Sequence, residues 1–467
     1  MATAAIGIAR VDAGVPLWRD EAVTAVAVSR SFPHLLGLVV HGDEAGMGSY
    51  FVGLKVWSAL GSGDRTLRCF SVLGGVVAVV ALALLVGRHF GRTAAWLSGL
   101  LLVTNPTFLY FLTELRSYSW VMAASVVSTA LVLHATTSGA RRWYVGYGVV
   151  VGIGLGLHLG FALVVAAQVA GVLAGRRHVR RSVTGLALAG LIAVLLLAPL
   201  LPAAAANSSQ VSWIPALDVP HLTSSLWGLA GTRAWGLLII SGLTVFIATR
   251  LRLRDGSTIG AATLVVFLAA VVPPVGLALV SVLKPMFIPR YMVGAVPFLA
   301  ACAGIGVASI RVPARAVRWL AAVVAALALT LFAANSPFHK SEIEDLRGAA
   351  TFLDAHRRPG DVVLFFPTYS RSALIRYWRD SPTADIAVRS WDPDRVQALE
   401  VPTSVLVARL RGHRRIWLVG YEHESWHRFP EPVAPLLPLL RAQPTLDLRH
   451  FGSFDVRLLP VPLALDP

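Results

Sequence analysis

Acidic residues are concentrated near the start of this chain. Of the nine Asp and Glu residues in positions 1–339, six precede residue 65, although 56% of the sequence is hydrophobic. A carboxylate beside a bilayer is costly unless it faces water, a partner or a substrate, so the adjacent pair Asp20 and Glu21 in PLWRDEAVTA points to chemistry. Asp20 can take a proton from an attacking hydroxyl, while Glu21 holds the Asp20 carboxylate in place or tunes its basicity. Asp20 can also cap the helix predicted from the following residues, whereas we interpret Asp12 and Asp64 as solvated loop charges.

A second polar cluster, His41, Asp43 and Glu44, lies in HGDEAGMGSYFVGLKVW. The amphipathic stretches around it predict two helices that lie on the membrane surface. Together with Asp20 and Glu21, these carboxylates offer hard oxygen ligands that can hold a divalent cation. No motif requires a cofactor, so a divalent cation is the one cofactor that the sequence leaves open.

Further polar side chains recur at the ends of later apolar segments. Glu114, Arg116 and Tyr118 stand at alternate positions in NPTFLYFLTELRSYSW. An interfacial aromatic belt with a local Glu–Arg pair would explain this spacing, but Arg116 is also well placed to bind an anion. His158, in LGLHLGF, is a lone histidine between apolar helices, where a structural role is the alternative to a place in the site.

One late connection has a composition that suits phosphate. KPMFIPRYMVGAVPF carries Lys284, Arg290 and Tyr291, with two prolines that stiffen the chain. Two cations beside a tyrosine can clamp a phosphate group. The candidate substrate-binding residues are therefore His41, Asp43, Glu114, Arg116, Tyr118, His158, Lys284, Arg290 and Tyr291.

The elements that must position these residues belong to an integral membrane protein. Mean hydropathy is +0.67 and only 14% of the residues are charged. The net charge of +16 would favour nucleic acid only if the basic residues shared one soluble face. Instead they cluster between apolar runs, as in cytoplasmic loops, and this argues against a nucleic-acid partner. The clusters are Arg88 and Arg92, Arg141 and Arg142, Arg176 to Arg181, Arg250 to Arg254, and Arg311 to Arg318.

Apolar segments between these clusters approach the ~20 residues that cross a bilayer. Their alternation places every arginine cluster inside and the segments 105–117, 157–160, 205–231 and 284–290 outside. Residues 1–67 then form an outer acidic loop with juxtamembrane helices, before a transmembrane core at 68–335. The predicted spans are 68–87, 93–113, 117–136, 143–158, 159–175, 183–204, 232–249, 257–283, 291–310 and 316–334.

A small soluble domain is predicted at 340–467. VVLFF, RIWLVGY and DVRLLPV have the pattern of strands, and SRSALIRYW and SVLVARLR have that of helices. Such an alternation is typical of a small α/β layer, which the topology places on the extracytoplasmic side. The predicted fold class is therefore an α-helical polytopic membrane protein of about ten to eleven transmembrane helices with a C-terminal α/β domain.

The order of the fragments resembles a known family. W-R-D-E-A lies in the first outer loop, H-x-D precedes a Tyr-containing amphipathic helix, and L-R-x-x-S-V-L-G enters a span. N-P-x-x-x-Y-x-x-x-E-x-R-x-Y and P-R-Y-x-x-x-x-x-P follow. Over roughly residues 15–300 the chain is similar to the C-type membrane glycosyltransferases of the protein O-mannosyltransferase and aminoarabinose transferase clan.

The resemblance implies a transferase that takes a sugar from a polyprenyl-phosphate donor and inverts its anomeric centre. The acceptor would be an extracytoplasmic glycan, glycolipid or protein, and the family's first-loop Asp, its base, matches Asp20. Members closest in pattern do not need a metal. The family has a helix before the acidic loop and often a Pro-Pro pair after H-x-D, where this chain reads EAGMGSY. We therefore expect that a leading helix is missing or that the chain start is misassigned.

Two other functions compete with transfer. A membrane transporter or flippase of a lipid-linked or anionic substrate would also use outer Arg and Glu residues. It would more usually show mid-span ionisable residues or paired broken helices, and Pro273–Pro274 has no evident mate. A non-catalytic assembly protein would leave Asp20 and Glu21 unexplained. The prediction is thus a multi-pass hexosyl- or pentosyltransferase of the cell membrane, with the transporter as the alternative.

Overall fold

The chain divides into two compact units. The computed structural model describes residues 1–42, 45–175, 179–206, 213–251, 260–310, 314–334, 344–378, 384–391, 396–421 and 432–462. A helical unit contains Met1–Ala13, Glu44–Gly53 and Arg68–His339, and a mixed unit contains Gly14–Asp43, Leu54–Leu67 and Lys340–Pro467. Asp20, Glu21 and Asp64 therefore belong to the same unit as the C-terminal part of the chain.

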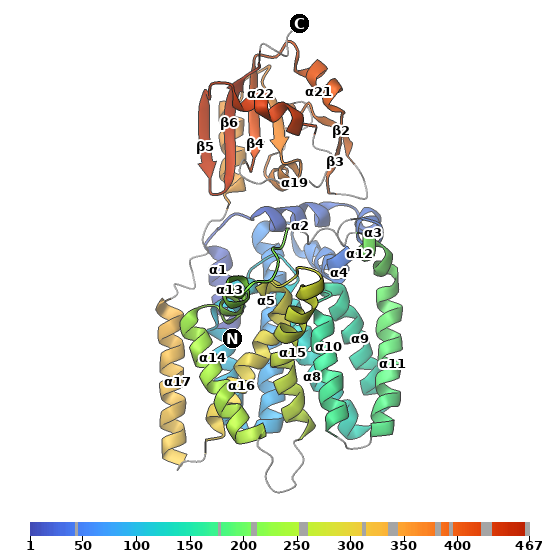
Figure 1. Ribbon diagram of the computed structural model, residues 1–467, viewed down its shortest axis with the longest axis vertical. Coiled ribbons are helices and arrows are strands. Elements are labelled where there is room, and N and C mark those ends of the chain that lie inside the picture. Colours follow the sequence, from blue (N-terminus) through green and yellow to red (C-terminus); the bar gives the residue numbers. More distant parts are fainter. Residues whose placement is uncertain are drawn as a thin grey trace. The chain divides into compact units, whose positions relative to one another are not determined.

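Long helices run side by side in the helical unit (Figure 1). A helix pairs its backbone groups within the segment, and together with apolar side chains this is what a bilayer requires. The elements are α1 (Ala2–Asp12), η1 (Ala45–Met47), α4 (Gly48–Trp57), α5 (Asp64–Phe90), α6 (Arg92–Val103), α7 (Pro106–Leu112), α8 (Tyr118–Ser138), α9 (Arg141–Leu157), α10 (Phe161–Ala174), α11 (Val179–Leu197), η3 (Ala198–Leu200), α12 (Leu201–Ala206), α13 (Val219–Ala230), α14 (Arg233–Phe246), η5 (Ile247–Leu251), α15 (Ala261–Leu283), η6 (Pro289–Ala295), α16 (Val296–Ala308) and α17 (Ala314–Ala334). The C-terminal end of α4 and the N-terminal end of α5, within Leu54–Leu67, belong to the mixed unit.

Among the described helices, six are long and apolar enough to cross a membrane. They are Asp64–Phe90, Tyr118–Ser138, Ser182–Ala206, Arg233–Arg250, Ala261–Leu283 and Pro289–Ala308. The expected span 93–113 is instead two helices, α6 and α7, that meet at 65° and could form a seventh span. The bend arises because Asn105 starts a new helix: its side chain accepts the Phe108 N–H at 3.0 Å and donates to the Ala230 carbonyl at 2.9 Å.

Small residues allow the helices to approach closely. A Cβ atom added to Gly148 of α9 would lie 2.8 Å from the Ala189 Cα of α11, and one added to Gly304 of α16 would lie 2.6 Å from the Ser98 backbone nitrogen of α6. Glycine at such positions lets transmembrane helices pack backbone against backbone. This packing brings the connections between helices, which carry the candidate residues, into fixed positions.

The mixed unit contains a four-stranded sheet with the order β1-β4-β6-β5, in which only β1 and β4 are parallel. β1 and β4 lie where VVLFF and RIWLVGY predict strands. α21 begins and ends one residue before the helix predicted from SVLVARLR. Leucines of α21 and α22 pack with β1 and β4 in one core. The elements are α2 (Arg19–Ser29), α3 (Phe32–Val40), η2 (Ser58–Leu60), α18 (Leu346–His356), β1 (Val362–Phe366), α19 (Tyr369–Leu374), β2 (Val388–Trp391), β3 (Ala398–Glu400), α21 (Thr403–Leu410), β4 (Arg415–Gly420), η7 (Ala434–Leu436), α22 (Leu437–Arg441), β5 (Asp447–Phe451) and β6 (Phe454–Pro460).

Helix α2 packs against α19 within the mixed unit. α19 is itself anchored by Arg371, which is buried and pairs with Asp385 and, at 2.7 Å, with Glu400. Buried charges are tolerated when they are paired in this way. The helix that carries Asp20 and Glu21 thus packs on α19, which buried ion pairs fix to the C-terminal part of the chain.

Candidate functional site

Candidate residues of the helical unit come together from three connections. The rings of Tyr118, which begins α8, and of His158, in the α9–α10 turn, have centroids 6.1 Å apart. The His158 ring is 4.7 Å from the ring of Tyr291 in η6, and the Arg290 guanidinium carbon is 5.9 Å from the Tyr291 centroid. We call Glu114, Arg116, Tyr118, His158, Arg290 and Tyr291 the arginine cluster.

The α9–α10 turn approaches η6 too closely for any residue except glycine. α9 ends at Leu157, and the next residue, His158, turns its Nδ1 back to accept the Gly160 N–H at 3.0 Å. A Cβ atom at Gly160 would lie 2.6 Å from the Tyr291 carbonyl oxygen. The absence of a side chain at Gly160 therefore sets the distance between His158 and Tyr291.

The electrostatics of the arginine cluster favour an anion. Burial, together with the positive charges of Arg290 and Arg116, lowers the pKa of His158 to about 4. His158 is therefore neutral at pH 7 and acts through hydrogen bonds. Glu114, 2% exposed, adds one buried carboxylate to the cluster.

Arg290 is oriented by an aromatic residue that the sequence did not single out. Its guanidinium carbon lies 5.0 Å from the ring centroid of Trp213. Such stacking holds the planar group in one orientation. The stretch QVSWIP that contains Trp213 follows no recognisable spacing, so no sequence signal marked it.

Two other predicted residues lie at exposed helix ends. Lys284 follows α15 as its C-cap, and His41 follows α3 in the mixed unit. His221 of α13 binds the carbonyl of Phe287 through its Nε2 at 2.6 Å, so it ties α13 to the connection that carries Lys284. Asp43 and Glu44 lie outside the described residues.

In the mixed unit, the acidic pair occupies the first turn of α2. The helix begins at Arg19 with Trp18 as N-cap, so the prediction that Asp20 caps this helix is wrong. The Trp18 N–H instead points to the Glu21 Oε2 at 3.4 Å. Asp20 has a side chain that is 27% exposed, whereas Glu21 is fully buried. Asp20 can thus exchange a proton with a substrate, while Glu21 holds the turn, where a helix favours negative charge.

Arg19, the residue before Asp20, is enclosed by residues of the C-terminal part. Its backbone N–H donates to the Glu344 Oε2 at 2.7 Å, and its Nη1 donates to the Tyr369 hydroxyl at 3.1 Å. Its guanidinium carbon lies 4.8 Å from the Tyr421 ring centroid. We call Arg19, Glu344, Tyr369 and Tyr421 the Arg19 pocket. Burial raises the pKa of Glu344, and Arg19 offsets this only in part.

The interpretation of Asp64 as a solvated loop charge is wrong. Its Oδ2 accepts the Tyr377 hydroxyl at 2.6 Å and the Arg347 Nη2 at 3.0 Å, and its Oδ1 accepts the Arg376 Nη2 at 2.7 Å. We call these four residues the Asp64 cluster. Asp64 is about 300 positions from its three partners, and no local pattern could reveal that they meet.

The comparisons with known proteins agree with this architecture. Residues 43–202 match the family described as dolichyl-phosphate-mannose-protein mannosyltransferase. ArnT from Cupriavidus metallidurans in the apo state has a similar fold, with a TM-score of 0.61 at 14% identity over 95% of this chain and 93% of that one. The chain matches the same protein bound to undecaprenyl phosphate with a TM-score of 0.64 at 15% identity, over 98% and 96%. These matches indicate a membrane glycosyltransferase.

The chain also resembles a more distant structure, and the resemblance to the C-type family is confirmed. The oligosaccharyltransferase AglB from Archaeoglobus fulgidus, in complex with an inhibitory peptide and a dolichol-phosphate, has a TM-score of 0.52 at 10% identity, over 90% of this chain and 66% of that one. No curated protein matches the chain by sequence. The family match includes Arg116 and His158 but neither Asp20 nor Arg290.

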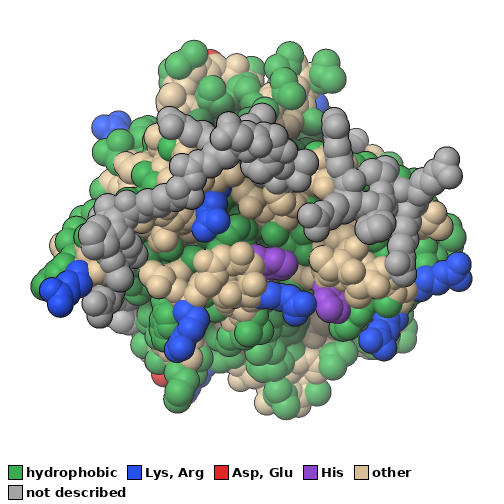
Figure 2. Space-filling model, turned by 90° about the horizontal axis from the view of Figure 1, so that it is seen from below, with side chains coloured by type: hydrophobic (Ala, Val, Ile, Leu, Met, Phe, Trp, Pro, Cys, Tyr) green, Lys and Arg blue, Asp and Glu red, His purple; other side chains and the backbone are tan. Residues whose placement is uncertain are grey.

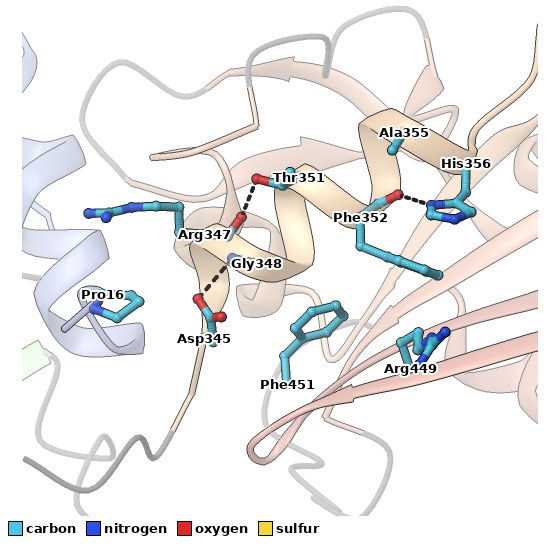
Figure 3. Close-up of a pocket in the computed structure, with 10 residues that line it drawn as sticks. All are labelled: Pro16, Asp345, Arg347, Gly348, Thr351, Phe352, Ala355, His356, Arg449 and Phe451. Carbon is cyan, nitrogen blue, oxygen red and sulfur yellow. Dashed lines mark hydrogen bonds between the residues drawn. The ribbon is translucent and has the colours of Figure 1, made fainter. Parts of the chain in front are cut away.

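An open pocket of the glycosyltransferase lies along α18 in the mixed unit (Figure 3). Two of its polar lining groups bond to backbone groups of the helix: Asp345 accepts the Gly348 N–H at 2.8 Å, and the Thr351 hydroxyl donates to the Arg347 carbonyl at 2.9 Å. Figure 3 shows the Phe352 and Phe451 side chains beside each other at its wall. The pocket combines this aromatic surface with the polar side chains of Asp345, His356 and Arg449.

A metal site is not evident in the described part of the glycosyltransferase. No group of three or more His, Cys, Asp or Glu residues there has the geometry to hold a metal ion. Two of the four carboxylates predicted as ligands, Asp43 and Glu44, are outside that part. The divalent cation therefore stays a prediction.

Proposed function

We propose that the glycosyltransferase transfers a sugar from a polyprenyl-phosphate donor to an extracytoplasmic acceptor, with inversion at the anomeric carbon. The observation that carries this proposal is the arginine cluster, which joins two guanidiniums, a neutral histidine and two tyrosines from three separate connections. A phosphate that gains charge as the sugar leaves needs fixed cations of this kind.

The nature of the donor is supported by the structural neighbours. ArnT has been solved bound to undecaprenyl phosphate, and AglB in complex with a dolichol-phosphate. Both ligands are polyprenyl phosphates, which combine a long apolar chain with one anionic headgroup. A chain of apolar helices whose connections carry Arg116 and Arg290 offers an environment for each part.

Asp20 is the proposed general base. The acceptor hydroxyl oxygen forms a bond to the anomeric carbon while the bond from that carbon to the phosphate oxygen breaks. The bonding electron pair leaves with the polyprenyl phosphate, and the hydroxyl proton passes to the Asp20 carboxylate. Partial exposure of Asp20 supports this role, and the burial of Glu21 supports a role in holding the first turn of α2. The remaining predicted residues, His41, Asp43 and Lys284, are assigned to substrate binding.

The positions of arginines support an extracytoplasmic site. α5 has Arg88 in its last turn, α6 begins at Arg92 and α9 begins at Arg141, all at helix ends that the topology places inside. Figure 2 shows Lys and Arg side chains spread among apolar ones on one face of the molecule, with few Asp or Glu. We propose ten to eleven spans in the transmembrane core 68–335, an outer loop at 1–67 and an extracytoplasmic domain at 340–467.

The test is donor turnover by the purified protein in lipid nanodiscs. Polyprenyl-phosphate-linked mannose, arabinose, aminoarabinose and glucose, each radiolabelled in the sugar, are offered with fractions of the bacterial cell envelope as acceptors. Release of polyprenyl phosphate together with label in an acceptor supports the proposal. If no donor is consumed with any fraction, the proposal of sugar transfer is wrong. Movement of the intact donor across the bilayer then becomes the function to test.

A further inference from the structure

Two separate segments of the acidic loop are bound by the C-terminal part of the chain. Residues 14–43 and 54–67 share a compact unit with residues 340–467. The Arg19 pocket holds the first segment and the Asp64 cluster holds the second. The C-terminal part therefore contacts the chain on both sides of the segment that contains Asp20 and His41.

One phenol links the two segments directly. The Tyr377 hydroxyl accepts the Leu17 N–H at 3.0 Å and donates to the Asp64 Oδ2 at 2.6 Å. Burial and the hydrogen bond to Asp64 raise the pKa of Tyr377, so the phenol keeps its proton and can make both bonds at once. Leu17 itself is fully buried. Tyr377 thus fixes the backbone three residues before Asp20.

The Arg19 pocket fixes the backbone immediately before Asp20. Glu344 accepts the N–H of Arg19 itself, at the first residue of α2, and Tyr369 and Tyr421 enclose its guanidinium. A helix that is held at its first residue and just before it cannot rotate about its axis without breaking these bonds. Rotation is the motion that would move the Asp20 carboxylate away from a substrate hydroxyl.

We propose that Tyr377 and Glu344 are positioning residues, which hold the first turn of α2 so that Asp20 points at the acceptor hydroxyl. This inference rests on the proposed function, in which Asp20 is the base. It assigns to the C-terminal part of the chain a role in the reaction. A misplaced catalytic group lowers turnover by roughly 10- to 100-fold while substrate binding persists.

The test compares the steady-state kinetics of Tyr377→Phe with those of Tyr147→Phe. Both changes delete one hydrogen-bonded phenol hydroxyl, because Tyr147 of the helical unit donates to the Gln168 Oε1 at 2.9 Å. We expect Tyr377→Phe to lower kcat about tenfold with the KM for the donor within about twofold of wild type. Tyr147→Phe should leave kcat within about twofold.

Hydrogen exchange by mass spectrometry separates positioning from general loosening. In Tyr377→Phe the amide of Leu17 should exchange faster, and in Tyr147→Phe it should exchange as in wild type. Faster exchange at Leu17 with an unchanged kcat would overturn the inference, because α2 would then be freed without any effect on the reaction.

A second pair of variants decides the matter if Tyr377→Phe does not fold. Glu344→Gln keeps an oxygen that accepts the Arg19 N–H, whereas Glu344→Ala removes it. We expect kcat near wild type for the former and about tenfold lower for the latter. Equal rates for both would refute the positioning role.

Asp20→Asn is measured in parallel so that the two proposals can fail separately. If Asp20→Asn is inactive while Tyr377→Phe and Glu344→Ala are fully active, only the positioning role is wrong. If Asp20→Asn keeps full turnover, the assigned base is wrong and the positioning inference falls with it.

Discussion

Replacing Arg290 by Gln should weaken binding of polyprenyl phosphate about 10- to 100-fold. Hydrogen bonds to charged groups contribute roughly 1.5–3 kcal/mol, and each 1.4 kcal/mol is about a factor of ten in Kd. The guanidinium is partly buried and lies 5.0 Å from the Trp213 ring centroid, so its charge is screened less than that of a surface arginine. Arg290→Lys should lose about tenfold, since it keeps the charge but not the planar stacking group.

The assay is equilibrium binding of labelled undecaprenyl phosphate to the protein in nanodiscs. Arg142→Gln is a matched control, because the Arg142 guanidinium carbon also lies over a tryptophan, 5.5 Å from the Trp143 ring centroid, at the start of α9. Its Kd should equal that of wild type. A Kd for Arg290→Gln within twofold of wild type, or an equal loss in Arg142→Gln, would refute the assignment of Arg290 to the phosphate.

Three further changes test the site and the fold. Gly160→Ala should weaken donor binding by about tenfold, because its Cβ would meet the Tyr291 carbonyl at 2.6 Å, whereas Gly190→Ala, with open space around it, should not. Arg371→Ala should destabilise the protein by roughly 3–5 kcal/mol, since it leaves two buried carboxylates without their arginine, and a lower melting temperature in thermal unfolding would show it. The lowered pKa of His158 means that the unfolded chain binds more protons than the folded one between pH 6.5 and about 4. Stability should therefore fall as pH falls through that window, by at most about 1.4 kcal/mol per pH unit. His158→Asn should flatten this part of a plot of melting temperature against pH. A plot that His158→Asn leaves unchanged would contradict the lowered pKa.

The sequence allowed the members of the arginine cluster to be predicted, because each lies at the end of an apolar segment. Span counting places the ends of alternate segments at one membrane face, and that is enough to group Arg116, His158 and Arg290. It cannot find Trp213, which lies in a connection without periodicity. It also cannot find the bend between α6 and α7, which depends on the bond from Asn105 to a carbonyl 125 residues away.

The contacts of the acidic loop could not be predicted from the sequence. Arg19 and Glu344 are 325 positions apart, and their contact depends on how the C-terminal sheet packs rather than on any local pattern. For the same reason the sequence predicts a solvated charge at Asp64, since an isolated Asp before a helix is usually one. The role proposed for Asp20 rests on the family resemblance and on its partial exposure, whereas the contacts that hold the start of α2 are visible only in the fold.

The central claim is that Asp20 removes the proton of the acceptor hydroxyl, and a single-turnover experiment tests it most directly. Enzyme saturated with labelled donor is mixed with acceptor, and release of polyprenyl phosphate is followed for wild type, Asp20→Asn and the control Asp12→Asn. We predict that Asp20→Asn lowers the rate at least about 100-fold with an unchanged donor Kd, and that Asp12→Asn changes neither. A rate for Asp20→Asn within threefold of wild type would contradict the account.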